Sequence, residues 1–365
     1  MGVPEKIKKI EEEMRKTQIN KATEHHVGLL RAKLAKLKQE QEEARSSGQG
    51  SSVGFNVKKS GDSTVALVGL PNVGKSTLLN RLTNSKSRVG SYRFTTLTVI
   101  PGILEHKGAK IQILDLPGII KEASSGKGLG KRILSAARSA DMILLMIDVF
   151  QPEIYPVLLK ELRGMGIRPD ERPPNIIIEK NKSGGISITN MVKLTKLSNK
   201  LITEIFHVYR INSARVLVKE DITAEQLVDA ILGTRQYIPT LTVLNKVDLV
   251  NLGFINEIKS RLKTDFIPIS ADADMNIQAL KEHIYQRLDF IRIYLRPKGG
   301  ETDYVEPLII KSGACVQDIC EKIHRSMKKE FRYAQIWAKS AKHRGQRVGL
   351  DHRLQDEDVI TLIKQ

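Results

Sequence analysis

The sequence predicts an α/β fold in which a central domain with a parallel-rich sheet carries smaller attached domains. The main observation is that, from Thr64 onward, short apolar runs alternate with helix-like segments; the runs include VALVGL, IQILDLPG, MILLMIDV and TLTVLNKVDL. Such alternation is typical of βαβ units whose strands are buried on both faces of a parallel sheet. The second observation is length, because 365 residues are enough for two or three domains.

The N-terminal residues 1–45 are expected to form a helical hairpin, because they are almost free of Gly and Pro. Apolar side chains recur there at helical spacing in two groups. These groups are Ile7, Ile10 and Met14, followed by Leu30, Leu34 and Leu37. The Gly/Ser-rich stretch SSGQGSSVG follows, so residues 46–62 are expected to be a flexible linker.

A GxxxxGKS motif follows the first apolar run, and the helix-like sequence TLLNRLT comes directly after it. Its glycines let successive backbone N–H groups and the helix N-terminus point at phosphates. The motif lysine reaches the β and γ oxygens, and the serine hydroxyl binds Mg²⁺. The motif therefore predicts a P-loop for a nucleoside triphosphate. The candidate residues are Gly69, Pro71, Asn72, Val73, Gly74, Lys75, Ser76 and Thr77, with Lys75 also a catalytic candidate.

Two further motifs are expected to complete the phosphate and metal site. Asp115 ends the run IQILDL, where its carboxylate can hold Mg²⁺ through water, and the N–H of Gly118 can sense the γ-phosphate. Between these motifs, residues 92–96 form a polar loop in which a threonine is expected to complete the Mg²⁺ shell. Thr96 is preferred to Thr95 for this role. The predicted metal ligands are Ser76, Thr96 and Asp115, and Thr96 and Gly118 are also catalytic candidates.

A purine selector is predicted at the sequence NKVD, which follows the apolar run TLTVL and contributes Asn245, Lys246 and Asp248. The Asp248 carboxylate can accept hydrogen bonds from N1–H and the N2 amine of guanine, a donor pair that adenine lacks. After the run FIPIS, Ser270 and Ala271 are expected to present a backbone N–H to guanine O6. The motifs in this order predict that the chain binds GTP and GDP and hydrolyses GTP.

The spacing of these motifs predicts an insertion. Asp115 and Asn245 are 245 − 115 = 130 residues apart, whereas two βαβ units need only about 30 residues each. The central domain, residues 63–290, is therefore expected to be interrupted by an α/β subdomain at residues 163–237. Residues 291–365 read as a separate α+β domain, since the strand and helix pattern changes after RIYLRPKGGE.

The charge of the chain favours acidic partners. A formal net charge of +18 and a pI near 9.7 favour association with RNA, the ribosome or an acidic protein. Tyr333 and Trp337 lie within a C-terminal basic cluster and are expected either to stack on bases or to pack in the core. The basic residues of this cluster are Arg325, Lys328, Lys329, Arg332, Lys339, Lys342, Arg344 and Arg347.

The cysteines Cys315 and Cys320 are predicted to be small buried hydrophobic residues.

A cytoplasmic protein without membrane contact is expected. The sequence has no run of roughly 18 to 20 apolar residues, and MGVPEKIKKIEEE lacks the apolar stretch of a signal peptide. Lys6 occupies the position where a myristoylation signal has Ser or Thr, and TLIKQ contains no Cys for prenylation.

The motifs match the translation-factor-related class of P-loop GTPases, and the run YRFTTLTVIPGILEHKGAKIQILDLPGII with GKGLGKRILSAARSAD resembles the Obg and DRG branch. The opening KIKKIEEEMRK, the insertion sequences GGISIT and YRINSARV, and the ending FRYAQIWAKS and LQDEDVITLIK are similar to the DRG (developmentally regulated GTP-binding) family over essentially the whole chain. The resemblance implies a helix-turn-helix at 1–45, an insertion like a ribosomal-protein domain, and a β-grasp-like TGS domain at 291–365. It also implies weak intrinsic turnover, ribosome or RNA contact, and a DRG-family regulatory partner protein.

The catalytic machinery departs from the Ras pattern. Ras-like enzymes place a water-orienting glutamine after the glycine of DxxG, whereas Ile119 and Ile120 follow here. In potassium-activated relatives the residue at the position of Asn72 helps to bind K⁺, so K⁺ stimulation is expected, with loop stabilisation as the simpler role. Arg88 and Arg93 are competing candidates for an internal arginine finger.

The function inferred from the sequence is a ribosome- or RNA-associated, translation-related GTPase switch. The alternative is a nucleotide-stabilised scaffold that binds a protein or RNA through its TGS domain.

Overall fold

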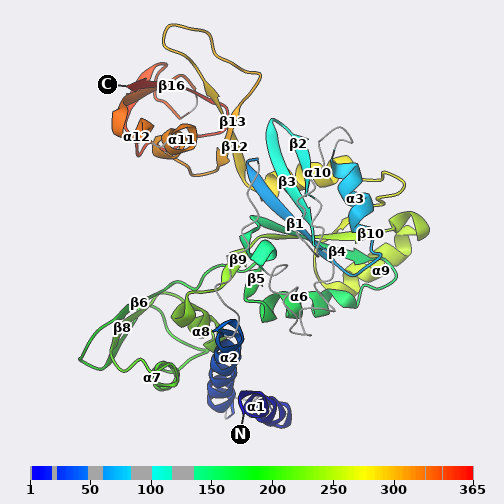
Figure 1. Ribbon diagram of the computed structural model, residues 1–365, viewed down its shortest axis with the longest axis vertical. Coiled ribbons are helices and arrows are strands. Elements are labelled where there is room, and N and C mark those ends of the chain that lie inside the picture. The colour runs from blue at the N-terminus through cyan, green and yellow to red at the C-terminus, as the bar shows by residue number, and fades with distance from the viewer. Residues whose placement is uncertain are drawn as a thin grey trace. The chain divides into compact units, whose positions relative to one another are not determined.

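The chain divides into two compact units. The computed structural model describes residues 2–18, 23–47, 61–83, 101–116, 135–324, 326–338 and 340–364. One unit combines Met1–Phe55 with Gly166–Tyr237, and the other combines Asn56–Met165 with Ile238–Gln365. The sheet that leads into the phosphate-binding motif belongs to the second of these units (Figure 1).

A six-stranded sheet forms the core of the second unit. Its order is β11-β10-β4-β1-β3-β2, and all neighbouring strands are parallel except β2 and β3, which form an antiparallel hairpin. All seven residues of β1 are buried, as expected for a strand covered on both faces. The strands are β1 Ser63–Gly69, β2 Pro101–His106, β3 Ala109–Asp115, β4 Met142–Asp148, β10 Thr240–Asn245 and β11 Ile267–Pro268. The α/β fold class predicted from the sequence is confirmed.

Helices pack against this sheet. Two of them, α3 and α10, pack together, and their leucines and isoleucines join the residues of β1 in one hydrophobic cluster. The helices are α3 Lys75–Leu82, α6 Ile154–Gly164, α9 Leu252–Leu262 and α10 Ile277–Arg287, with a short 3₁₀ helix η1 at Val247–Leu249. Because α3 begins directly after the phosphate-binding loop, its packing fixes the position of that loop.

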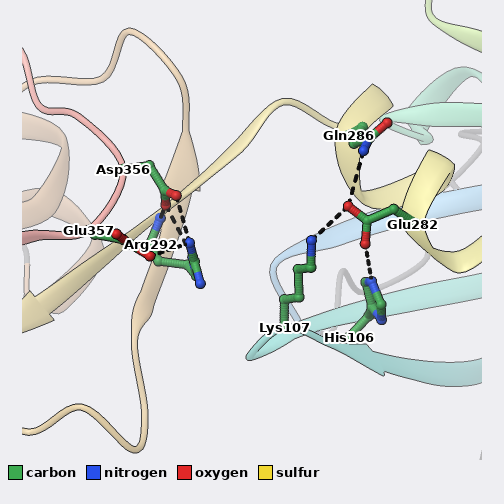
Figure 2. Close-up of polar contacts among 7 residues, drawn as sticks. All are labelled: His106, Lys107, Glu282, Gln286, Arg292, Asp356 and Glu357. Atoms are coloured by element: carbon green, nitrogen blue, oxygen red, sulfur yellow. Dashed lines mark hydrogen bonds and ion pairs between the residues drawn. The ribbon is translucent and has the colours of Figure 1, made fainter.

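Glu282 on α10 fastens the β2–β3 hairpin to this helix. Its carboxylate accepts hydrogen bonds from Lys107 Nζ (2.7 Å) and Gln286 Nε2 (3.1 Å), and it lies 3.0 Å from His106 Nε2 (Figure 2). The hydrogen bond from Lys107, followed by that from His106, lowers the pKa of Glu282 to about 2. The carboxylate therefore stays ionised and keeps its partners far into the acidic range.

The C-terminal part forms a mixed five-stranded sheet of order β13-β12-β16-β14-β15, crossed by the helix α11. Only β12 and β16 are parallel; the other pairs are antiparallel. Arg292 of β12 binds Asp356 (2.7 Å) and Glu357 (2.8 Å), which tie the loop before β16 to the sheet (Figure 2). The elements are β12 Phe290–Leu295, β13 Leu308–Lys311, α11 Val316–Ile323, α12 Met327–Glu330, β14 Phe331–Ile336, β15 Gln346–Val348 and β16 Asp358–Lys364.

The two cysteines differ in environment. Cys320 is fully buried on the face of α11 that contacts the sheet, and burial raises the pKa of its thiol. Cys315 is only partly buried, so the prediction of a buried side chain is wrong for this residue. The reason is its place at the N-cap of α11, where its Sγ lies 3.2 Å from Asp318 Oδ2 at the helix surface.

The first unit joins two segments that are distant in the sequence. The hairpin helix α2 packs on α7 and α8 of the inserted segment (Figure 1). Lys36 Nζ donates to the carbonyl of Val208 (2.7 Å), and Tyr209 Oη donates to the carbonyl of Ala32 (3.2 Å). The elements are α1 Val3–Lys16, α2 Glu24–Ser47, β6 Ile176–Lys180, β7 Ile186–Asn190, α7 Asn199–Val208, β8 Ala214–Val218 and α8 Ala224–Leu232. This union of hairpin and insertion was not anticipated from the sequence.

A buried ion cluster links α8 to the short strands β5 (Ile167–Pro169) and β9 (Gln236–Ile238), through which the chain enters and leaves the insertion. The side chain of Asp229 is 3% exposed and receives hydrogen bonds from Arg168 (2.6 and 2.7 Å) and Arg235 (3.2 Å). A carboxylate buried to this degree is stable only when it is paired.

Within the described residues, no helix combines the length and the apolar composition needed to span a bilayer.

Candidate functional site

The phosphate-binding loop follows the buried strand β1 and closes against β4. Gly69 must be glycine because a Cβ there would lie 2.6 Å from the carbonyl oxygen of Met146. Gly74 has φ +95°, and a Cβ there would lie 2.4 Å from Asn245 Nδ2. Asn72 also has positive φ, at 61°, which residues other than glycine rarely adopt. The loop is therefore curled as a phosphate cradle requires, with Pro71 exposed on its outer turn.

Lys75 is the first residue of α3 and is 8% exposed. Its ammonium donates to the backbone carbonyls of Gly69 (3.1 Å) and Leu70 (2.7 Å). Burial lowers the pKa of Lys75, and the nearby charge of Asp115 partly opposes this effect. In the part of the chain that the structure describes, its hydrogen-bond partners are neutral carbonyls, so phosphate oxygens would be stronger partners for this buried cation.

A cluster of oxygen atoms lies beside the first turn of α3. Ser76 Oγ donates to Asp115 Oδ2 at 2.9 Å, which joins the helix to the end of β3. The other carboxylate oxygen of Asp115, Oδ1, is buried and has no hydrogen-bond partner within the described residues. An unpaired buried carboxylate oxygen is costly, and a hard cation such as Mg²⁺ would compensate it. This pair fits the predicted metal site; Thr96 and Gly118 lie outside the described residues.

Asn245 connects three parts of the site from the end of β10. It is 2% exposed. Its Nδ2 donates to the carbonyl of Val73 in the phosphate loop at 2.8 Å, and its Oδ1 accepts from the amide of Ala271 at 3.0 Å. The motif asparagine thus holds the phosphate loop and the loop after β11 at a fixed separation.

The other residues of the NKVD sequence lie at the rim. Lys246 has φ +67° and its Nζ pairs with Asp148 Oδ2 at 2.6 Å. Asp248 is exposed on η1, where its carboxylate is accessible to a base. Sequence reasoning missed Asp148, although it ends the run MILLMID and is the register partner of Asn245 on the neighbouring parallel strand. Aligning the carboxyl ends of the parallel strands would have found it.

The loop after β11 differs in detail from the expectation. The amide of Ser270 donates to the carbonyl of Met275 (3.2 Å), and the amide of Ala271 donates to Asn245. Ser270 Oγ accepts from the amide of Ala273 at 3.0 Å. Both amides that were assigned to guanine O6 are thus already engaged within the protein, because they build the loop and hold Asn245.

Part of this set lines a cavity of about 330 Å³, within the range typical of small-molecule sites. The predicted site residues Gly69, Asp115, Asp248 and Ser270 are not among its lining residues. The phosphate loop, the first turn of α3 and the two base-recognition loops all contribute to its wall. Its lining residues are Asn72, Gly74, Lys75, Ser76, Thr77, Asn245, Lys246, Ala271 and Asp272. The structure thus brings together motifs that are up to 200 residues apart (272 − 72 = 200).

The C-terminal aromatic residues are covered by arginines. The guanidinium of Arg347 lies 4.7 Å from the ring centre of Tyr333, and that of Arg296 lies 4.5 Å from Trp337. Both rings are half-buried, and Trp337 Nε1 donates to Thr361 Oγ1 at 3.3 Å. Among the described residues, neither ring belongs to the hydrophobic core cluster of this domain, and each packs against an arginine instead. Stacking of these rings on bases stays a prediction. The exposed charges of this surface are Lys328, Lys329, Arg332, Lys342, Arg344 and Arg347, of which Lys328 pairs with Glu321 at 3.1 Å. Arg325 and Lys339 lie outside the described residues.

Known proteins resemble the chain along its full length. Residues 64–180 match the family model described as 50S ribosome-binding GTPase, residues 183–290 match the C-terminal region of MMR_HSR1 domain, and residues 291–364 match the TGS domain. An uncharacterised GTP-binding protein of Methanocaldococcus jannaschii is 54% identical over 100% of this chain and 93% of its own length. Developmentally-regulated G-protein 3 of Arabidopsis thaliana is 46% identical over 100% and 99%. The human developmentally-regulated GTP-binding protein 2 is 44% identical over 100% of both chains.

Proposed function

The chain belongs to the family of developmentally regulated GTP-binding proteins and is a P-loop GTPase, and we propose that it acts as a translation-related switch on the ribosome or its RNA. The observation that carries the nucleotide assignment is a cavity to which the phosphate loop and both base-recognition loops contribute lining residues. The ribosomal assignment is supported by the net charge of +18 and by the match of residues 64–180 to the family described as 50S ribosome-binding GTPase.

Binding of GTP would exchange partners inside the site. The ammonium of Lys75 would leave the carbonyls of Gly69 and Leu70 for the β- and γ-phosphate oxygens, where it meets negative charge. Ser76 and Asp115, with Thr96 from the switch loop, would hold Mg²⁺. When bound, this ion neutralises charge between the β- and γ-phosphates. Loss of the γ-phosphate would release Thr96 and Gly118, and that release is the proposed switch.

The hydrolysis step is proposed to be slow without help. The chain has isoleucines after Gly118 in place of a water-orienting glutamine. Asn72 lies on the cavity wall, exposed and with positive φ, where its side-chain oxygen is accessible to a cation beside the phosphates. K⁺ held there would supply the positive charge that an arginine finger supplies in other GTPases. The competing arginines, Arg88 and Arg93, lie outside the described residues.

Base selection is proposed to depend on Asp248. Its exposed carboxylate accepts from N1–H and the N2 amine of guanine. Asp248→Asn should transfer preference from GDP to xanthosine diphosphate, since the 2-oxo group of xanthine matches an amide donor. Competition binding of the two nucleotides measures this exchange, and an unchanged preference for GDP would refute the assignment.

The turnover experiment compares GTP hydrolysis in KCl and in NaCl at equal ionic strength, with and without purified ribosomes. The proposal expects K⁺ and ribosomes each to raise the rate, and Asn72→Ala to abolish only the K⁺ effect. If GTP binds but neither addition changes a negligible rate, a nucleotide-stabilised scaffold is the better description. Lys75→Ala tests that alternative, because a folded, nucleotide-free scaffold would still bind its partner.

The ribosome contact is proposed to use the exposed basic surface of the TGS domain. Replacing Lys342, Arg344 and Arg347 by alanine removes three positive charges and should weaken co-sedimentation with ribosomes most at low salt. Substituting three exposed lysines of the insertion, Lys180, Lys182 and Lys193, provides a charge-matched control. We also propose that the protein binds a DRG-family regulatory protein and that it is located in the cytoplasm.

A further inference from the structure

Arg81 contacts the loop that follows β11 although 190 residues separate them in the chain. It lies in the last turn of α3. Its Nε donates to the carbonyl of Ala271 at 3.1 Å, and its Nη2 donates to the carbonyl of Asp272 at 2.9 Å. The phosphate-loop helix and the base-recognition loop are thereby joined directly, independently of Asn245.

The side chains of Asn245 and Arg81 bind the loop after β11 at different atoms of Ala271. Asn245 Oδ1 binds the N–H of Ala271, while Arg81 binds the C=O of the same residue. The loop is further closed by hydrogen bonds between the backbones of Ser270 and Met275 (3.2 and 3.0 Å). Within the described residues, the N–H of Asp272 is left without a hydrogen-bond partner.

The orientation of that free N–H follows from peptide geometry. The carbonyl of Ala271 and the N–H of Asp272 belong to one peptide group, and in a trans peptide they point in opposite directions. Since the carbonyl is directed at Arg81, the N–H is directed away from it. Ala271 and Asp272 line the nucleotide cavity, whereas Arg81 is not among its lining residues. The N–H of Asp272 is therefore directed away from Arg81, and it belongs to a residue that lines the cavity.

We infer that Arg81 is a positioning residue for base recognition: it orients the Ala271–Asp272 peptide so that the N–H of Asp272 donates to the 6-oxo group of guanine. The inference rests on the proposed GTP site and refines it, because the amides of Ser270 and Ala271 are occupied. A guanidinium suits the role, since it holds two donors in a rigid fork that reaches two successive carbonyls. A lysine ammonium can also donate to two carbonyls, as Lys75 does, but its donors share one nitrogen and are not held in a fixed planar fork.

The test compares dissociation constants of GDP, 6-thio-GDP and IDP for the full-length chain. Sulfur at position 6 is a weak acceptor, so the ratio of 6-thio-GDP to GDP dissociation constants reports the Asp272 contact. IDP lacks the N2 amine, so its ratio to GDP reports Asp248. Arg81→Ala should weaken GDP about tenfold, which corresponds to about 1.4 kcal/mol. It should reduce the 6-thio-GDP ratio toward one and leave the IDP ratio unchanged.

Two further variants separate positioning from folding. Arg81→Lys should fall between the parent and Arg81→Ala in the 6-thio-GDP ratio. Arg261→Ala removes the same charge from the exposed surface of α9 and should change neither ratio. If Arg81→Ala leaves the ratio of 6-thio-GDP to GDP dissociation constants unchanged, as equal weakening of all three nucleotides would, the inference is overturned. If the parent protein binds no guanine nucleotide, the proposed function itself fails, which is a distinguishable result.

Discussion

Asn245 offers the sharpest test of how the site is held together, because its side chain joins two loops without needing a ligand. Asn245→Ala removes the hydrogen bond to the carbonyl of Val73 (2.8 Å) and the one from the amide of Ala271 (3.0 Å). All three residues are 2% exposed, so water cannot replace the lost partners easily. A net hydrogen bond contributes about 1 kcal/mol, and an orphaned buried partner costs about 1 to 3 kcal/mol. With partial relaxation of both loops, we expect a loss of about 2 to 4 kcal/mol in the free energy of unfolding.

The assay is urea unfolding of nucleotide-free protein, followed by far-UV circular dichroism. Hydrogen exchange of peptides from residues 64–82, 240–250 and 267–280 localises the effect, since a chain with several domains does not unfold as one two-state unit. Exchange should accelerate in the phosphate loop and in the loop after β11. Asn256→Ala, on the exposed surface of α9, is the control and should stay within about 0.5 kcal/mol of the parent. If Asn245→Ala behaved like this control, the connecting role of Asn245 would be refuted.

Three further predictions concern other parts of the chain. Gly74→Ala should abolish GDP binding in a titration, because φ is +95° and the new Cβ would collide with Asn245 Nδ2 at 2.4 Å; a bound variant would contradict the geometry. Asp229→Ala should lower the stability of the unit that contains the insertion by about 3 to 5 kcal/mol, because two arginines lose their buried partner. Thermal unfolding measures this effect, and a loss below about 1 kcal/mol would show that the cluster is not needed for stability. The pKa of Glu282 is lowered to about 2 from 4.5, so its stabilising contribution is present above about pH 4.5 and is lost as the pH falls toward 2. Melting temperatures between pH 3 and 6 should therefore fall more steeply for the parent than for Glu282→Gln, and parallel curves would argue against this linkage.

The phosphate loop was predictable because its chemistry is local. Gly69 to Ser76 are contiguous, and their spacing between a buried strand and a helix sets the backbone curl, including the positive φ of Gly74. The central strands were predictable for a related reason. Strands buried on both faces need continuous apolar runs, and such runs are visible without any partner. The order of the motifs then followed, since the carboxyl ends of neighbouring parallel strands meet at one edge of a sheet.

The sequence by itself therefore determined the fold class, the P-loop and the identity of the base-selecting carboxylate as predictions. Only the tertiary structure decided that α2 packs on the insertion, that Asn245 spans two loops, and that Arg81 holds the loop after β11. It also showed that the backbone amides of Ser270 and Ala271 are hydrogen-bonded within the protein. The physical reason is that these contacts join residues far apart in the chain through a few hydrogen bonds and apolar contacts. An exposed arginine on a helix has the same local pattern whether its guanidinium is solvated or bound to a carbonyl, so the pattern alone carries no signal of the partner.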